Sequence, residues 1–315
     1  MNVRLTQIDG KLPNLALMKL AHWHRARGDT VHLTRRVHPE LFEPRYDRVY
    51  ASAIFSYSRD KLERFQQEWP DAIVGGTGTP ELHTVEGITG QYEKYDYSDY
   101  PDYPYSLGFL QRGCRLKCKF CVVPTKEGKP SQNMTVAELW RGEGYPKKLH
   151  ILDNDFFGVP GWQQHVKDIN DGGFKVCLNQ GINVRLIHDE GAEALASMEY
   201  RDDQFQSRRI YTAWDNLGDE KIFMKGIDTL ERAGIPAKHV MAYMLIGYDP
   251  KEDWDRVLTR YNRMRERGIS PYPMVYENKT YPGDDRTLKQ FQRWAVRLAQ
   301  SGKITWENYD PKAKA

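Results

Sequence analysis

Cysteine is scarce in this sequence of 315 residues, since it occurs only at positions 114, 118, 121 and 177. So few cysteines, three of them within eight residues, exclude a disulfide framework and favour metal binding or redox chemistry. Long apolar runs are also lacking, because none approaches the roughly 20 residues that span a bilayer, and we expect no membrane role. The first twenty residues have charges within their apolar stretches and lack a small-residue cleavage site. They do not resemble a secretory signal, so we predict a cytoplasmic protein.

A large excess of charge of either sign is missing as well. The 46 Lys and Arg residues nearly balance the 43 Asp and Glu residues, which leaves a net charge of +3. This mildly basic balance is compatible with a nucleic acid or an anionic small molecule and decides for neither. The hydrophobic content of 40% is ordinary for a globular protein, and the length allows two domains or one large one.

Strand and helix patterns alternate through residues 1–95. Strand patterns lie at 2–8, 30–37, 48–55 and 72–80, and helix patterns at 12–28 and 58–70. This alternation favours a small parallel sheet covered by helices, so we predict a Rossmann-like or flavodoxin-like wound domain. Residues 96–105, which are rich in Tyr, Asp and Pro, have no steady period and are predicted to form an extended linker.

Six further strand patterns follow within residues 106–280. They lie at 106–113, 148–155, 174–181, 208–216, 240–247 and 270–278, with helix patterns at 135–142, 162–171, 190–198, 220–234 and 253–268. Six such repeats imply parallel strands in a wound sheet or a partly closed barrel. We predict a partial (β/α)6 barrel of the TIM type, with its chemistry at the carboxyl ends of the strands. Residues 281–315 are predicted to form a C-terminal helix and a frayed tail.

The stretch GFLQRGCRLKCKFC, residues 108–121, contains three of the four cysteines. Cys114, Cys118 and Cys121 have the spacing C-x3-C-x2-C, and Phe120 directly precedes the last of them. Structural zinc usually takes two pairs of ligands, and no second Cys or His pair stands nearby in the sequence. Three thiolates on a four-iron cluster leave one iron open to another ligand. A zinc site with a remote fourth ligand, in a non-catalytic module, stays the alternative.

In its spacing, its aromatic residue and the strand pattern before it, this stretch resembles the motif of the radical S-adenosylmethionine (SAM) superfamily. The resemblance implies a partial α/β barrel in which Cys114, Cys118 and Cys121 hold a 4Fe-4S cluster and SAM binds the open iron. Reduction then cleaves SAM to a 5'-deoxyadenosyl radical that abstracts hydrogen from the substrate. An electron donor such as flavodoxin or ferredoxin is the implied partner.

The end of the second barrel strand resembles the place where that superfamily receives the amino group of SAM. Asp153, Asn154 and Asp155 stand there, and acceptor oxygens suit a protonated amine, although the sequence departs from the usual Gly-Gly-Glu. The alternative for these residues is an Asx turn that caps the next helix.

The next two strand ends carry further candidate SAM contacts. Arg185 follows Asn179 and Gln180 and is a candidate for the SAM carboxylate, with a solvated surface arginine as the alternative. Asp215 is the candidate for the ribose hydroxyls, with Trp214 as an apolar wall, or else Asp215 is a helix N-cap.

MLIGYDPKED, residues 244–253, resembles the adenine-binding region of the superfamily. Ile246 and Gly247 carry that resemblance, although the first glycine of the pattern is replaced. Tyr276, Glu277 and Asn278 end the sixth strand and are candidates to line a substrate cavity, or else they form a strand-end turn.

The amino-terminal domain resembles the cobalamin-binding domains that precede many radical SAM barrels, through residues 12–31 and 72–80. The usual Asp-x-His-x-x-Gly loop, whose histidine ligates cobalt, is replaced by IDGKLPNLA, which has no histidine. We therefore expect a degenerate structural or substrate-binding domain without cobalamin, and a cobalamin-dependent methylase stays an alternative. VGGTGT, residues 74–79, lacks the lysine and Ser/Thr of a P-loop, so we predict no nucleotide site there.

Missing cysteines also restrict the reaction. No cysteine precedes Cys114, whereas methylthiotransferases carry cysteines for a second cluster in their amino-terminal domain. An auxiliary cluster would need cysteines after the barrel, and no cysteine follows Cys177. We expect a single-cluster enzyme whose substrate is a nucleoside or nucleic-acid base, a small metabolite or a peptide. Cys177 lies in an apolar strand pattern and is interpreted as a buried thiol rather than as an extra ligand or hydrogen donor.

Overall fold

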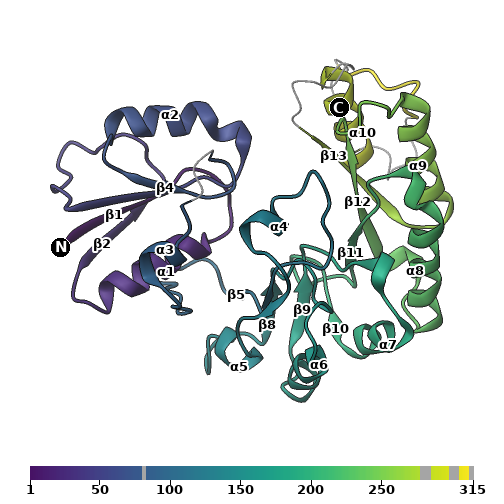
Figure 1. Cartoon of the computed structure of the whole chain (residues 1–315), viewed down its shortest axis with the longest axis horizontal. Helices are drawn as coiled ribbons and strands as arrows, with labels where there is room; N and C mark the ends of the chain where they lie inside the picture. The colour runs from purple at the N-terminus through teal and green to yellow at the C-terminus, as the bar shows by residue number, and fades with distance from the viewer. Residues whose placement is uncertain (80–82, 277–284, 298–304, 312–315) are drawn as a thin grey trace. The chain divides into compact units, whose positions relative to one another are not determined.

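The chain folds into two compact units, Met1–Pro104 and Tyr105–Ala315, each of which is described by itself (Figure 1). The computed structural model describes residues 1–79, 83–276, 285–297 and 305–311. Within these ranges, no helix has the length and apolar character of a membrane span.

The first unit is built on a four-stranded parallel sheet in the order β2-β1-β3-β4. Its strands are β1 (Asn2–Gln7), β2 (Thr30–Thr34), β3 (Arg48–Ser52) and β4 (Ile73–Gly75), and its helices are α1 (Leu15–Arg25), α2 (Arg59–Glu68) and α3 (Glu86–Thr89). The four strands and the two longer helices lie within the ranges that the sequence patterns predict. The four-residue helix α3 was not predicted, because so short a helix leaves no periodic pattern.

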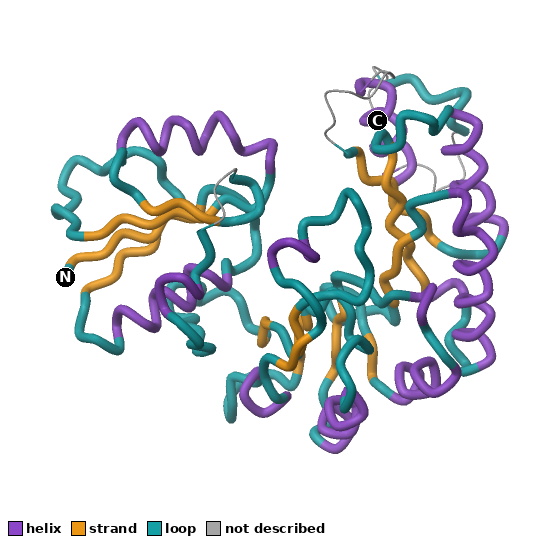
Figure 2. The backbone as a smooth tube through the Cα atoms, viewed as in Figure 1, coloured by secondary structure: helices purple, strands orange, loops and turns teal. Residues whose placement is uncertain are grey.

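Helices cover both faces of this sheet, with α1 on one face and α2 on the other (Figures 1 and 2). Because successive strand side chains point to opposite faces, the sheet contributes to two separate apolar clusters. The first contains Val3, Leu5, Leu17, Leu20, Ala21 and Tyr50, and the second contains Ile8, Val37, Ala51, Ala53, Leu62, Phe65 and Val74. The predicted α/β class of this unit is confirmed.

The glycine turn after β4 packs against the chain that follows β3. A Cβ atom added to Gly76 would lie 2.1 Å from the carbonyl oxygen of Ala53, so only glycine allows this approach. At the same edge, the Asp9 carboxylate accepts hydrogen bonds from the amides of Ile54 (2.8 Å) and Phe55 (3.0 Å). The glycines of this turn are thus explained by close backbone packing.

The Tyr-rich stretch predicted as a linker over 96–105 packs onto the first unit up to Pro104. Arg25 forms ion pairs with Asp96 (2.6 Å) and Asp99 (2.8 Å). The buried Tyr100 donates a hydrogen bond to Gln7 at 2.9 Å. These contacts make the stretch part of the folded unit.

The second unit contains the six predicted strands in chain order. They are β5 (Ser106–Gly108), β8 (Lys148–Ile151), β9 (Lys175–Leu178), β11 (Ile210–Ala213), β12 (Val240–Ile246) and β13 (Ser270–Val275). Parallel pairing gives one sheet in the order β10-β9-β8-β5, where β10 is Glu199–Tyr200, and another in the order β11-β12-β13. Beside β9 and β11, the Ile182 amide donates to the Tyr211 carbonyl at 2.8 Å. The strands are parallel as predicted, and they form two sheets rather than one continuous ladder.

Helices pack along the outer side of these strands (Figure 1). They are α5 (Val136–Leu139), α6 (Trp162–Asp171), α7 (Asp189–Ser197), α8 (Glu220–Arg232), α9 (Trp254–Glu266) and α10 (Asp285–Arg297). Alternate residues of β12, from Val240 to Ile246, are buried in the main core beneath these helices. A smaller cluster of Cys177, Phe205 and Tyr211, with Tyr243 packed against it, lies on the other face of the strands.

Candidate metal centre

The three cysteines of the C-x3-C-x2-C motif lie on one closed loop, residues 113–130, which we call the cysteine loop. The short strands β6 (Gln111–Arg112) and β7 (Ser131–Gln132) pair in antiparallel fashion at its base. Across this base, the Cys114 amide donates to the Gly128 carbonyl at 3.3 Å. The loop contains the short helix α4 (Val123–Lys126) and lies beside the carboxyl ends of β5 and β8 (Figure 2).

Gly113 lets the two ends of the cysteine loop approach each other. Its φ of +82° is in the left-handed region, and an added Cβ would lie 2.4 Å from the Lys129 carbonyl oxygen. Gly128, at φ +77°, has nothing within 4 Å of an added Cβ. Gly128 is therefore needed for its dihedral angle alone. Gly113 is needed both for its dihedral angle and for its lack of a side chain.

Glu127 ties the base of the loop together, a role that the sequence did not suggest. Its carboxylate accepts hydrogen bonds from the Gly113 amide (2.9 Å) and from Asn154 Nδ2 (3.1 Å). The Arg112 guanidinium lies 3.4 Å away. This mostly buried carboxylate thus joins both ends of the loop to the segment after β8.

Arg115 and Asp155 fasten the loop from its other side. Arg115 donates to both carboxylate oxygens of Asp155, at 2.7 and 2.9 Å, and its amide donates to the same carboxylate at 3.1 Å. The Asp155 side chain is 1% exposed, so this bidentate pair is largely shielded from water. Both oxygens are already engaged, which makes Asp155 an anchor of the loop rather than a free acceptor for the SAM amine.

Asp153 lies buried beneath the same segment. One oxygen accepts a hydrogen bond from the Leu110 amide at 2.8 Å, and the other has no partner among the described residues. Burial raises the pKa of this carboxyl to about 8, and hydrogen bonds from backbone amides offset only part of that effect. Asp153 is therefore neutral over much of the ordinary pH range, and a neutral buried carboxyl is a poor counter-ion for an amine.

Asn154 is the remaining member of the predicted amine-binding trio. It is partly exposed, and its nitrogen donates to Glu127. Its side-chain oxygen has no hydrogen-bond partner in the described part of the chain. Of the three predicted acceptors, Asn154 is the one whose oxygen can accept an additional donor.

The three thiols are partly buried. Burial raises the pKa of Cys114 and of Cys121, and the charge of Cys118 raises both pKa values further. The Leu116 amide donates to Cys114 Sγ at 3.4 Å. No three His, Cys, Asp or Glu side chains of the described ranges are close enough to share a single metal ion.

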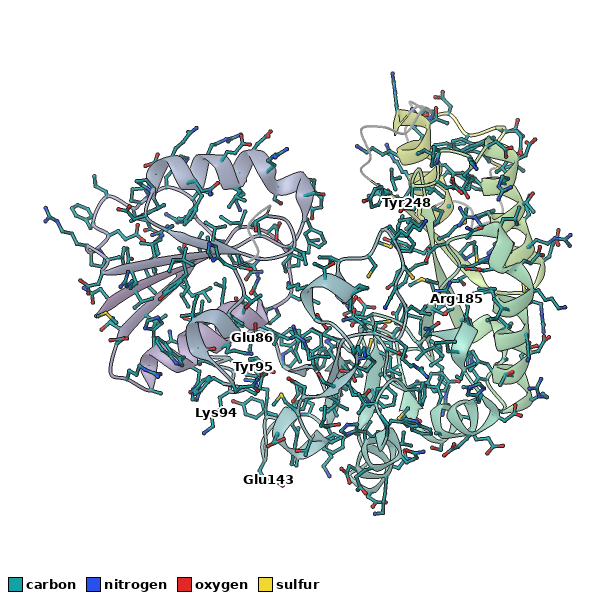
Figure 3. The ribbon with its side chains drawn as sticks, viewed as in Figure 1. Glu86, Lys94, Tyr95, Glu143, Arg185 and Tyr248 are labelled. Carbon is teal, nitrogen blue, oxygen red and sulfur yellow. The ribbon has the colours of Figure 1, made fainter. Side chains whose placement is uncertain are left out.

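Arg185 comes to the cysteine loop from the turn after β9 (Figure 3). Its guanidinium donates to Cys118 Sγ at 3.8 Å and to Asp219 at 2.8 Å. Burial acts to lower the pKa of Arg185, but these two hydrogen bonds raise it above its ordinary value. The alternative of a freely solvated arginine is wrong, and Asp219 is a partner that the sequence did not suggest.

Asp215, after β11, interacts electrostatically with one of these thiols, that of Cys121. Its carboxylate accepts a hydrogen bond from the Leu245 amide at 3.0 Å. Burial raises the pKa of Asp215, and its charge in turn raises the pKa of Cys121. The alternative N-cap role is not observed, because Asn216 caps the turn that follows.

Trp214 does not line a ligand site. Its side chain is fully buried in the main core, where it stacks on Phe223, and its ring nitrogen donates to the Asn216 carbonyl. The prediction of an apolar wall is therefore wrong. The sequence could not distinguish a residue that lines a ligand site from a residue of the core, because an apolar side chain at a strand end suits both.

The buried Arg260 of α9 holds two of these strand ends in place. It donates to the carbonyl oxygens of Trp214 and Leu245, both at 2.8 Å, and forms an ion pair with Glu252. The arginine side chain is 0% exposed. The sequence did not indicate that Arg260 is buried, because an arginine in a helix usually faces solvent.

Phe120 packs against the end of β12. Its ring lies 5.3 Å from that of Tyr248, which in turn lies 5.0 Å from Tyr276. Gly247 has a φ of +80°, and the Ile246 side chain is fully buried in the main core. A ligand could therefore contact the backbone at Ile246 but not its side chain. The predicted apolar contact with adenine would require the side chain.

The hydrogen bonds of Asn179 in the described ranges do not involve the thiols. Its carbonyl accepts a hydrogen bond from Tyr243 at 3.1 Å, and its buried side-chain oxygen has no partner among the described residues. Cys177 is fully buried as predicted. Glu277 and Asn278, candidates for a substrate cavity, lie outside the described residues.

Comparison of the chain with models of known families and with curated proteins finds no match to either.

Proposed function

We propose that the protein is a radical SAM enzyme with a single 4Fe-4S cluster. The observation that carries the proposal is a closed loop that bears three partly buried thiols and is fastened at both ends. Arg185, after β9, donates a hydrogen bond to Cys118, and the charge of Asp215, after β11, acts on Cys121. We further infer that the six parallel strands of the second unit form a partial (β/α)6 barrel, and that the first unit is a flavodoxin-like wound domain.

The donor set fits the proposed cluster. Cys114, Cys118 and Cys121 would each ligate a different iron, so the sulfurs need not converge on one point as they must for a single zinc ion. When bound, the cluster supplies the electron that cleaves SAM to the 5'-deoxyadenosyl radical. The two anchors of the loop, Arg115–Asp155 and Glu127, hold the thiols ready for ligation.

The residues around the loop suit the charges of SAM. Arg185 offers a guanidinium to the carboxylate, and Asn154 offers its free side-chain oxygen to the amino group. Asp215 is an acceptor for the ribose hydroxyls, and the rings of Phe120 and Tyr248 help to exclude water from this edge. Since the electron must come from outside, a flavodoxin or ferredoxin is the proposed donor.

The test is anaerobic reconstitution with iron and sulfide, followed by metal analysis and an assay for 5'-deoxyadenosine with SAM and dithionite. We expect about four irons per chain and measurable 5'-deoxyadenosine. Cys118→Ala should lose both, whereas the matched control Cys177→Ala should lose neither, because that thiol is buried away from the loop. Zinc in place of iron, with no cleavage of SAM, would replace the proposal with the zinc-module alternative.

Cobalamin is not part of the proposal. The first unit has no histidine in the loop after β1, where Asp9 binds two backbone amides instead. Protein purified after growth with cobalamin should contain no cobalt. Stoichiometric cobalt would favour the cobalamin-dependent methylase.

A further inference from the structure

Positive charge is concentrated on the cysteine loop. Residues 113–130 contain five basic residues and one acidic residue, a net charge of +4, whereas the whole chain has +3. The rest of the chain is therefore net negative by one charge. A local excess of this kind attracts a polyanion rather than a single small anion.

Three of these cations are available to a ligand. Lys117, Lys119 and Lys129 are exposed, and their side chains have no ion pair or hydrogen bond in the described ranges. Lys117 and Lys119 alternate with the less exposed Leu116, Cys118 and Phe120. The lysines thus lie on the solvent side of the loop while the thiols are partly buried.

Aromatic rings lie next to these lysines. Phe120 directly follows Lys119 and contacts Tyr248, which contacts Tyr276, and all three rings are partly exposed. Cations combined with partly exposed rings are the pattern by which proteins bind single-stranded nucleic acid, where lysines contact phosphates and rings stack on bases. An acidic protein would use the cations but would need no rings.

We propose that the cysteine loop binds single-stranded nucleic acid, which makes a nucleotide within such a strand the substrate of the enzyme. This inference rests on the proposed function and names its substrate class. Lys117, Lys119 and Lys129 contact phosphates, and a base stacks against Phe120 and Tyr248. A single strand is required because the bases of a duplex are not accessible to side-chain rings.

The test is the binding of a fluorescein-labelled single-stranded RNA of mixed sequence, about 15 nucleotides long, to the full-length protein, followed by anisotropy over a range of KCl concentrations. The slope of log K against log[KCl] should fall in magnitude by about 1.4 in Lys117→Gln/Lys119→Gln, since each phosphate contact on a single strand contributes about 0.7. The control Lys147→Gln/Lys238→Gln changes two exposed lysines that precede β8 and β12, and it should leave the slope unchanged.

Tyr248→Ala separates stacking from charge. We expect about tenfold weaker binding with the salt slope unchanged, whereas Tyr145→Ala, which removes an exposed ring elsewhere, should bind as the wild type does. The proposal would be overturned if the two double lysine variants changed the salt slope equally. It would also be overturned if the protein bound neither the RNA nor a DNA strand of the same sequence. If an acidic ferredoxin then bound with the expected salt dependence, the loop would instead be a protein-docking surface.

The binding test stands apart from the proposed function, because it does not require the cluster. Iron content and 5'-deoxyadenosine are measured on the same preparation without nucleic acid. Cleavage of SAM without binding of RNA would contradict only the proposed substrate class. Binding of RNA without cleavage of SAM would contradict only the proposed radical SAM function.

Discussion

Asp153 and Asp155 are the same type of residue two positions apart, yet their surroundings differ. Asp155 faces the Arg115 guanidinium and accepts three hydrogen bonds from Arg115. Asp153 is turned into the core, where hydrogen bonds from backbone amides do not offset the effect of burial, and its pKa rises to about 8. The chemical properties of each carboxyl group at this strand end therefore depend on its own surroundings.

Asp153→Asn should make stability less dependent on pH. Because the native carboxyl has a pKa above the roughly 3.9 of the unfolded chain, the folded state binds more protons between about pH 4 and pH 8. The free energy of unfolding of the wild type therefore falls as pH rises through this window. The difference between wild type and variant should change by up to about 1.4 kcal/mol per pH unit.

Urea unfolding of both proteins at several pH values measures this difference. The variant should be at least as stable as the wild type near the upper end of the window and gain nothing near the lower end. A difference that does not vary with pH would show that Asp153 is charged in the native protein.

Gly113→Ala should damage the cysteine loop more than Gly128→Ala does. Both substitutions put an alanine at a positive φ, which costs about 1–2 kcal/mol, but only the first places a methyl group against the Lys129 carbonyl. Denaturant unfolding gives the stabilities, and iron retained after reconstitution reports on the thiols. Equal losses in the two variants would mean that the ends of the loop do not approach as closely as described.

At the scale of elements, the site depends on contacts that join one secondary-structure element to another. The β6–β7 ribbon closes the loop, Asp155 joins it to β8, and Arg185 joins it to the turn after β9. Arg260 of α9 fixes the ends of β11 and β12. Each of these contacts pairs residues that are far apart in the sequence.

Arg260→Met tests one such contact. Removal of the guanidinium leaves the Glu252 carboxylate buried without its partner, which should cost about 3–5 kcal/mol of unfolding free energy. Arg260→Met/Glu252→Gln should recover part of this loss, because no unpaired charge then remains. Denaturant unfolding of the single and double variants measures the coupling, and a double variant as unstable as the sum of the single ones would argue against a buried ion pair.

At the scale of the whole molecule, the chain divides into two units with their own apolar cores. The boundary falls after Pro104, so the first unit includes the stretch whose composition suggested a linker. Tyr100 and the two carboxylates paired with Arg25 account for this assignment.

A fragment of residues 1–104 should fold cooperatively without the rest of the chain. A fragment of residues 1–95 should be less stable by about 2 kcal/mol or more, because it lacks the buried Tyr100 and both partners of Arg25. Urea unfolding followed by circular dichroism compares the two. Equal stability would show that the stretch after residue 95 is only a linker.

The elements and their class could be predicted from local patterns in the chain. The strand and helix patterns predicted six strands in the second unit and four in the first, because hydrophobic periodicity is a local property. The sequence also placed the three cysteines on a loop after a strand, and it identified Cys177 as buried from its apolar neighbours. Arg185 and Asp215 were predicted as site residues through the resemblance to the radical SAM superfamily, since both follow strands whose carboxyl ends gather polar residues.

Which of these residues contact one another became known only from the folded chain. Glu127, Asp219 and Arg260 have partners up to tens of residues away, and no local pattern encodes such pairs. The raised pKa of Asp153, the ion pair of Asp155 with Arg115, and the burial of Trp214 and Ile246 depend on which neighbours and how much water surround each side chain. Burial and partners arise only when the chain is folded, so the sequence could name candidates but not assign their roles.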